Sequence, residues 1–180
     1  MTPIARPAAN EHAPYYTGYI DAAEASLAQR GLADVVALLE AQTADWQGLM
    51  AAVPEAAASH AYAPGKWTLG ESLVHVSDTE RVFAYRLLRI ARGDRTPLPG
   101  FEQDDWVPTS RAGRRSLADI LAEMYAVRAA TLALVRSLDD EAISQSGVAS
   151  GKDVTARALV WMIAGHMQHH FGLTREKYLG

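Results

Sequence analysis

Four long segments of this 180-residue chain repeat apolar residues at helical spacing, and this pattern limits the folds open to it. Apolar residues that recur every three to four positions form one stripe along a helix, and that stripe must be buried against other helices. No segment shows the strict apolar–polar alternation of a half-buried strand. The pattern therefore predicts an all-α protein, a four-helix bundle with one long crossover connection. The expected helices cover about 32–52, 69–92 and 116–138, and a last one from 154 through Leu173.

Local signals place the ends of these helices and the connections between them. Thr68 and Glu71 have the spacing of a capping box, in which each side chain accepts from the other residue's backbone N–H. Pro54 ends the first helix, because the residue before a proline disfavours helical geometry. Residues 97–109 form the expected crossover, with a helical turn near 102–106, and the glycine-containing segment 139–153 is expected to be a polar connection.

Length and local composition predict one domain preceded by an arm. A chain of this length commonly forms a single domain with its own core. Residues 1–14 contain three prolines and little apolar periodicity, so we expect this segment to be a loosely packed arm. We expect residues 1–30 to be an N-terminal arm and residues 31–180 to be the bundle domain. The aromatic residues that follow Pro14 are interpreted as packing over the bundle or as part of an oligomer contact.

Composition excludes several classes of function. The chain has no cysteine, which excludes disulfides, thiolate metal ligands and cysteine nucleophiles. Its 17 basic and 21 acidic residues include no basic block, so nucleic-acid binding is not expected. No run of about 18 apolar residues exists, and no secretory signal precedes residue 31. We therefore expect a soluble cytoplasmic protein that does not bind a membrane.

The segment 165–171 contains three of the six histidines of the chain within an apolar run. His166 and His170 are four residues apart, so their imidazoles lie one turn apart on the same helix face. They take positions that leucine or isoleucine would fill, and a buried imidazole costs free energy unless its nitrogens have partners. Two interpretations stay open from this spacing, namely a pair of metal ligands and a pair of core histidines hydrogen-bonded to carbonyls or carboxylates.

His75 favours the metal interpretation, because it lies near the inner face of the second helix and can reach across the bundle. Three imidazoles from two helices leave one or more coordination positions free, as in a reactive site. An all-imidazole set suits zinc, nickel, iron or copper and does not select magnesium or calcium. His169 lies about 60° round the helix from His166, so we expect it beside the ligands or at the surface. His12 and His60 are given no role.

The same segments resemble the DinB-like (DinB/YfiT) superfamily. The resemblance rests on residues 66–81, 89–94 and 97–100 and on Ala164–His166 followed by His169 and His170, and it extends over about 32–178. It implies an up-up-down-down-like four-helix bundle, often a homodimer, with a divalent metal ion (zinc, nickel or iron) bound by three histidines. The metal ligands that it implies are His75, His166 and His170.

The resemblance also implies activities, because the superfamily includes metal-dependent hydrolases and low-molecular-weight-thiol S-transferases. Met167 departs from the pattern, since many relatives have glutamate after the first terminal histidine, which weakens any proposal of a general base there. Asp78, Thr79 and Glu80 are nearby polar candidates. We expect Asp78 to be hydrogen-bonded within the structure and Glu80 to be a surface ion-pair partner. No catalytic residue or substrate follows from the sequence.

Three hypotheses therefore result. The first is a three-histidine metalloenzyme, either a metal-dependent hydrolase or a thiol S-transferase with a small-molecule substrate. The second is a non-catalytic, metal-stabilised helical dimer that acts as a binding or stress-response module. The third is a plain helical dimer with hydrogen-bonded core histidines. Trp161, Tyr15 and Tyr16 are expected to supply aromatic surface for the homodimer.

Overall fold

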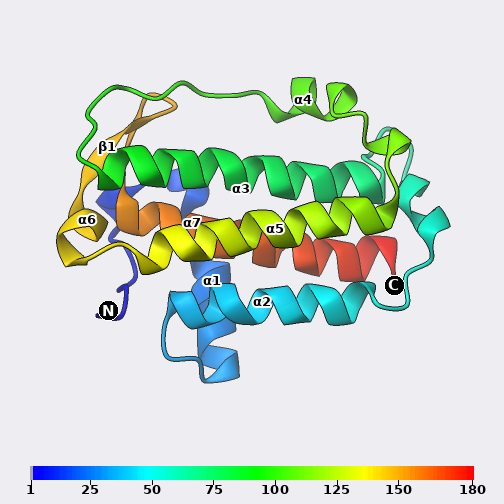
Figure 1. Cartoon of the computed structure of the whole chain (residues 1–180), viewed down its shortest axis with the longest axis horizontal. Helices are drawn as coiled ribbons and strands as arrows, with labels where there is room; N and C mark the ends of the chain where they lie inside the picture. Colours follow the sequence, from blue (N-terminus) through cyan, green and yellow to red (C-terminus); the bar gives the residue numbers. More distant parts are fainter. Residues whose placement is uncertain (1) are drawn as a thin grey trace.

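The computed structural model describes residues 2–180 as a bundle of four long helices, as the apolar periodicity predicts (Figure 1). The four are α2 (Val35–Met50), α3 (Leu69–Ala91), α5 (Leu117–Arg136) and α7 (Ala156–Leu173). Helix α3 packs against α5 and α7, and α2 packs against the same two helices. The all-α four-helix-bundle prediction is therefore confirmed, and each observed boundary lies within a few residues of the expected one.

Shorter elements connect and extend the bundle. The crossover after α3 runs along one side of the molecule and contains the predicted helical turn as α4 (Figure 1). The other short elements are α1 (Thr17–Arg30), α4 (Gln103–Thr109), α6 (Asp140–Ser144), 3₁₀ turns at Ala9–Glu11, Pro14–Tyr16, Glu55–Ser59 and Ala112–Arg114, and a π-helical turn at Thr174–Tyr178.

The predicted capping box begins α3. Thr68 Oγ1 accepts a hydrogen bond from the Glu71 backbone N–H at 3.2 Å, and the Thr68 N–H donates to Glu71 Oε2 at 2.8 Å. Two of the N–H groups that a helix start leaves without partners are thereby satisfied. This cap orients the first turns of α3, which carry His75.

A two-stranded hairpin replaces part of the polar connection expected over 139–153. Strand β1 (Ser146–Ala149) pairs antiparallel with β2 (Lys152–Thr155). Ser150 and Gly151 form the loop, with φ of 54° and 70°, as a tight two-residue hairpin turn requires. Each strand has only four residues, too few for an alternating pattern to be recognised in the sequence.

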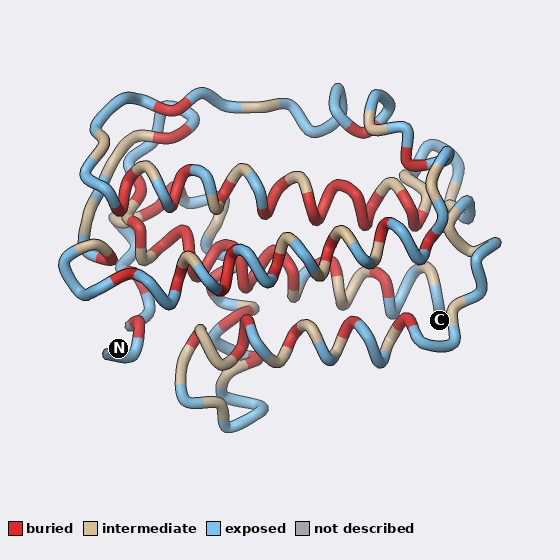
Figure 2. The backbone as a smooth tube through the Cα atoms, in the orientation of Figure 1, coloured by how far each residue is buried: buried red, intermediate tan, exposed pale blue. Residues whose placement is uncertain are grey.

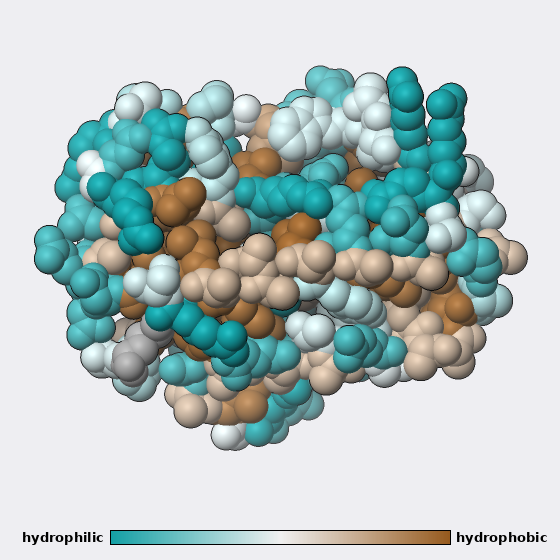
Figure 3. Space-filling model, in the orientation of Figure 1, coloured by the Kyte–Doolittle hydropathy of each residue, from teal (hydrophilic) through white to brown (hydrophobic). Residues whose placement is uncertain are grey.

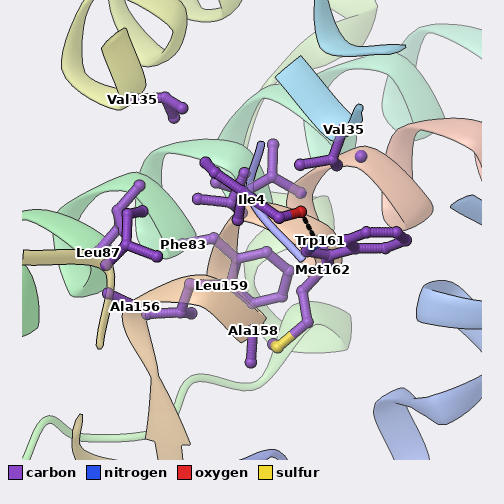
Figure 4. Close-up of a cluster of buried hydrophobic side chains, with 14 of the residues drawn as sticks. Ile4, Val35, Phe83, Leu87, Val135, Ala156, Ala158, Leu159, Trp161 and Met162 are labelled. Atoms are coloured by element: carbon purple, nitrogen blue, oxygen red, sulfur yellow. Dashed lines mark hydrogen bonds between the residues drawn. The ribbon is translucent and has the colours of Figure 1, made fainter. Parts of the chain in front are cut away.

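The N-terminal segment, predicted to be an arm, contains α1, which packs closely against α7. A Cβ atom added at Gly165 on α7 would lie 1.9 Å from the carbonyl oxygen of Tyr19 on α1, so only glycine permits this approach. One turn before Gly165 on α7, Trp161 Nε1 donates to the Ile4 carbonyl at 3.2 Å (Figure 4). The prediction that Trp161 lies on the surface is therefore wrong, because the N-terminal residues cover it.

Buried residues occur along all four long helices (Figure 2). The buried hydrophobic residues form two clusters. The first includes Phe83, Leu159 and Trp161 (Figure 4). The second includes Trp46 and Met167. Residues 164 and 167 on α7 belong to different clusters, so the histidine segment lies where the two meet. Within residues 2–180, no helix is both long enough and apolar enough to span a bilayer.

Candidate metal centre

Three histidines predicted to act together converge between α3 and α7. Helix α3 presents His75, and α7 presents His166 and His170. One possible ligand nitrogen from each residue lies within 4.8 Å of the other two. All three side chains are buried, with 4–6% of their surface exposed. Over residues 2–180 this is the only cluster of three or more histidine, aspartate or glutamate residues with such spacing.

The distances between these rings fit a single metal ion. The Nε2 atoms of His75 and His166 are 3.2 Å apart. Two imidazole nitrogens that each lie about 2.0–2.1 Å from one zinc ion are roughly 3.3 Å apart at a tetrahedral angle. The ring of His170 lies 5.0 Å from that of His75 and 4.6 Å from that of His166, measured between centroids. The donor set and its spacing therefore match a three-histidine site.

Hydroxyl groups flank two of the rings. Thr79 Oγ1 lies 3.5 Å from His75 Nδ1, and Ser72 Oγ lies 3.4 Å from His170 Nδ1. Groups that contact the second ring nitrogen orient a metal-binding histidine and set its tautomer. Within residues 2–180 the hydrogen-bond partners of the three rings are these hydroxyls and one another, with no carboxylate or carbonyl among them. The geometry therefore differs from that expected of ordinary hydrogen-bonded core histidines.

Burial keeps the three imidazoles neutral. It lowers the pKa of His75 to about 4, although the charge of Asp104 acts in the opposite direction. Burial, followed by the neighbouring histidines, also lowers the pKa of His166 and of His170 well below the usual value. A neutral imidazole retains the lone pair that a metal ion requires. At neutral pH the site therefore presents three unprotonated ligands.

A pocket of about 510 Å³ opens directly onto His75 and His170. Aromatic and polar side chains both line it. Two of the three rings thus border a pocket, as a reactive metal site requires, whereas a structural site is closed by its ligands. The aromatic residues are Tyr19, Tyr62, Trp67 and Tyr178, and the polar ones include Lys66, Gln103, Asp104 and His169.

Two segments far apart in the chain hold one wall of this pocket. The Tyr178 hydroxyl donates to the Trp67 carbonyl at 2.7 Å, and the Tyr62 and Tyr178 rings meet edge to face at 5.1 Å. The Trp67 ring in turn lies 4.9 Å from the His75 ring. The turn before α3 and the π-helical turn after α7 therefore form a single aromatic wall beside the triad.

Helix α1 supplies the opposite wall through Tyr19. Its ring meets that of His166 edge to face at 5.4 Å and lies 5.5 Å from that of His169. Burial raises the pKa of the Tyr19 phenol, which therefore stays protonated at neutral pH. Tyr19 was not among the predicted site residues. The small residue Gly165 beside His166 was a signal that another backbone approaches there.

The other predicted residues have mixed outcomes. His169 is exposed and lines the pocket outside the triad, as expected. His12 and His60 lie away from the triad; His12 is buried, with Nδ1 3.0 Å from the Ala13 carbonyl. The prediction that Glu80 is a surface residue is wrong, because it is buried in an ion pair with Arg128. Asp78 pairs with Arg81, as expected of a group bonded within the structure.

Comparisons with known proteins agree with this fold. A family profile described as the DinB superfamily matches residues 6–173. The structure of YfiT from Bacillus subtilis, described as a probable metal-dependent hydrolase with an unusual four-helix bundle topology, superimposes with a TM-score of 0.69 and 16% identity. That match covers 95% of this chain and 92% of YfiT.

A mycothiol-dependent maleylpyruvate isomerase is also similar, with a TM-score of 0.65 and 16% identity. The match covers 77% of this chain but only 58% of the isomerase. At this identity both likenesses establish the fold alone. No curated protein matches the sequence.

Proposed function

The chain belongs to the DinB superfamily, and from this premise we propose that it is a metal-dependent enzyme whose divalent ion is bound by His75, His166 and His170. The observation that carries the proposal is the position of the triad, whose three side chains are buried and of which His75 and His170 line a pocket. A purely structural metal site would need a fourth protein ligand, and no further histidine, aspartate or glutamate in residues 2–180 joins the cluster.

The ligand set favours a transition metal. Neutral imidazoles suit zinc, nickel or iron, and they leave the full positive charge of the ion uncompensated. When bound, such an ion supplies Lewis-acid activation of a water molecule, a carbonyl group or a thiol. The protein itself contributes the fixed ring positions and a pocket that restricts the approach of a ligand to one direction.

The reaction that fits best is hydrolysis of a small ester or amide. The proposal is supported by the likeness to YfiT, which is described as a probable metal-dependent hydrolase. Asp104 and His169 are titratable groups that line the pocket, and they are the candidates to accept or return a proton during the reaction. Lys66 is an exposed cation with no ion-pair partner in residues 2–180, so it can orient an anionic group of the substrate.

A second reaction is transfer of a low-molecular-weight thiol. The likeness to an isomerase described as mycothiol-dependent favours it. A pocket of about 510 Å³ is large enough for a small thiol and a second substrate together. Hydrolysis and thiol transfer share the triad and differ in the nucleophile, so one panel of substrates distinguishes them.

We also propose that the enzyme is a homodimer. Trp161 cannot contribute to its surface, but Tyr15 and Leu88 are exposed large residues outside the metal pocket. We propose that these side chains belong to one interface.

The test combines metal analysis with activity. Purified protein is stripped with a chelator, reloaded separately with zinc, nickel or iron, and analysed for bound metal. It is then assayed with esters, amides and thiol acceptors. We expect one metal ion per chain, loss of binding in His170→Ala and retention in the matched variant His169→Ala, which removes an adjacent exposed imidazole. Equal metal content in wild type and His170→Ala would refute the ligand assignment. A fully loaded protein with no activity on the panel would favour the non-catalytic binding module.

A further inference from the structure

A second hollow lies between α3 and the crossover segment, beside the metal pocket. It has a volume of about 380 Å³, and its walls are mostly apolar. Val82 and Tyr85 on α3 form one side, and Leu98, Phe101 and Trp106 of the crossover form the other. Figure 3 shows hydrophobic surface between the crossover at the top of the view and α3 below it. We call this hollow the crossover groove.

The walls of the crossover groove are held in place. Arg86 is buried, and its Nη2 donates to the Pro99 carbonyl at 2.8 Å and to Ser150 Oγ at 2.9 Å. The guanidinium carbon lies 5.8 Å from the centre of the Phe101 ring, which stacks on Trp106 at 4.7 Å. The crossover is therefore fastened to α3 and to the hairpin loop, and the groove is formed without a ligand.

Large aromatic surface is left uncovered in this groove. Tyr85 is 51% exposed and Trp106 is 42% exposed, and their rings line opposite sides. Covering apolar surface yields about 25 cal/mol per Å². A fixed groove that keeps two such rings in water is typical of a binding site for an apolar group.

The same two elements line the groove and the metal pocket. On α3, Ser72 and His75 line the metal pocket, and Asp78 is the first residue of that helix to line the groove. A rise of 1.5 Å per residue places Val82 roughly 10 Å along α3 from His75. On the crossover, Gln103 and Asp104 line the metal pocket, whereas residues 101 and 106 line the groove. The two linings lie three residues apart on α3 and two residues apart on the crossover, so one small ligand is long enough to contact both.

The charged side chains that line the groove indicate which part of a ligand it can bind. Arg81 pairs with Asp78 at 3.3 Å and with Glu123 at 2.6 Å, so its charge is already neutralised. Arg86 directs its donors to the Pro99 carbonyl and the Ser150 hydroxyl. Arg86 makes no ion pair within residues 2–180, but its side chain is only 2% exposed, so the exposed cation of the groove is the paired Arg81. An aromatic ring or a short alkyl chain is the matching occupant.

We propose that the crossover groove binds the neutral, apolar end of a substrate whose polar head lies at the histidine triad. The inference rests on the proposed metal-dependent function and adds the substrate class, namely a small molecule with a metal-binding head and an aromatic or short alkyl end about 10 Å away. Trp106 and Tyr85 are then specificity-determining residues, and they act on the apolar end alone.

Hydroxamic acids of different length test this assignment, because they share one metal-binding head. Calorimetry on the zinc-loaded full chain would compare acetohydroxamic acid with 4-phenylbutanohydroxamic acid. We expect the phenyl compound to bind at least tenfold more tightly to wild type. We expect Trp106→Ala and Tyr85→Ser each to remove most of that gain without changing the affinity for acetohydroxamic acid. Tyr15→Ala, which removes an exposed ring outside the groove, should retain the gain.

Each contrary result has a separate meaning. If zinc loads but the two compounds bind equally, or if the gain survives both groove variants, the groove assignment is wrong and the metal site stands. If neither zinc nor a hydroxamate binds, the proposed function fails as well. If Trp106→Ala instead converts a dimer to a monomer in light scattering and leaves the preference for the phenyl compound unchanged, a second copy of the chain covers the groove and the inference is overturned.

Discussion

Arg128 and Glu80 form a two-pronged ion pair inside the bundle, with both N–O distances at 2.8 Å and both side chains at most 4% exposed. Arg128 Nη1 also donates to Gln42 Oε1 at 2.8 Å, and Gln42 Nε2 donates to the Ala164 carbonyl at 2.8 Å. These contacts join α5, α3, α2 and α7 two residues before His166. The ion pair therefore fixes the helix that carries two of the proposed ligands.

Removing one partner of this pair should destabilise the protein strongly. Arg128→Met leaves the Glu80 carboxylate buried without its partner, and we expect a loss of about 3–5 kcal/mol in the free energy of unfolding, measured with urea. The double variant Arg128→Met/Glu80→Leu should lose less than the sum of the single variants. The exposed pair of Arg136 and Glu40 is the control, since Arg136→Met should cost less than about 1 kcal/mol. Equal effects in the two arginine variants would contradict the importance of the buried pair.

Gly165→Ala tests the close contact of α1 with α7. The added Cβ would lie 1.9 Å from the Tyr19 carbonyl oxygen, so α1 must move away. We expect a loss of at least about 2 kcal/mol in the free energy of unfolding, with faster proteolysis within residues 1–30. Gly172→Ala on the same helix has no atom within 4 Å of the new Cβ and should be neutral or stabilising by up to about 1 kcal/mol. Similar stability in both variants would show that the contact is not restrictive.

Metal binding should stabilise the folded state through the triad. At a free zinc concentration of about 1,000 times Kd, the expected gain is about 4 kcal/mol. Thermal unfolding of chelator-treated protein with and without zinc measures it. His75→Ala should show little or no gain, whereas His60→Ala, which removes an exposed histidine away from the triad, should match wild type. A gain that survives in His75→Ala would place the metal elsewhere.

The metal-free protein should lose stability as the pH falls from about 6.5 towards 4. Burial lowers the pKa of His75 to about 4 in the folded state, whereas the unfolded chain takes up a proton near pH 6.5. The unfolded state therefore binds more protons in this window, and acid favours it. His75 alone should account for about 2 kcal/mol between pH 7 and pH 5.

Urea unfolding at pH 7 and pH 5 measures this difference, with the non-titrating variant His75→Asn as control. Asp94 does not interfere at pH 5, because its hydrogen bond with Arg89 lowers its pKa to about 2. If the variant loses as much stability as wild type over this range, the imidazole of His75 is not the group responsible.

The proposed homodimer can be tested by measuring the mass of the protein in solution. Light scattering at micromolar concentration should give about twice the chain mass of 19.5 kDa. Tyr15→Ser and Leu88→Ser should weaken a dimer that uses these side chains, because both are at least 40% exposed. A monomeric mass for wild type would remove the proposal.

The parts of the fold and site predicted from the sequence are those that depend on local spacing. The Thr68–Glu71 cap and the apolar stripe of α3 are local, and so is the four-residue step from His166 to His170. His75 could be selected as the third ligand because it lies near the apolar stripe of its own helix, which faces the interior of the bundle. The burial of Glu80 was not predictable in this way, because its partner lies on α5, 48 residues farther along the chain. The burial of Trp161 likewise depends on Ile4, 157 residues before it.

The contact between Tyr19 and Gly165 also constrains the order in which the protein folds. Helix α1 packs against α7, which lies near the other end of the sequence and is therefore synthesised much later. Contacts between such distant segments form late and slow the folding of a chain. Until α7 is in place, α1 lacks the helix against which it packs most extensively, and the metal pocket lacks His169 and His170. A newly made chain therefore becomes able to hold a ligand only in the last stage of its folding, when its two end segments meet.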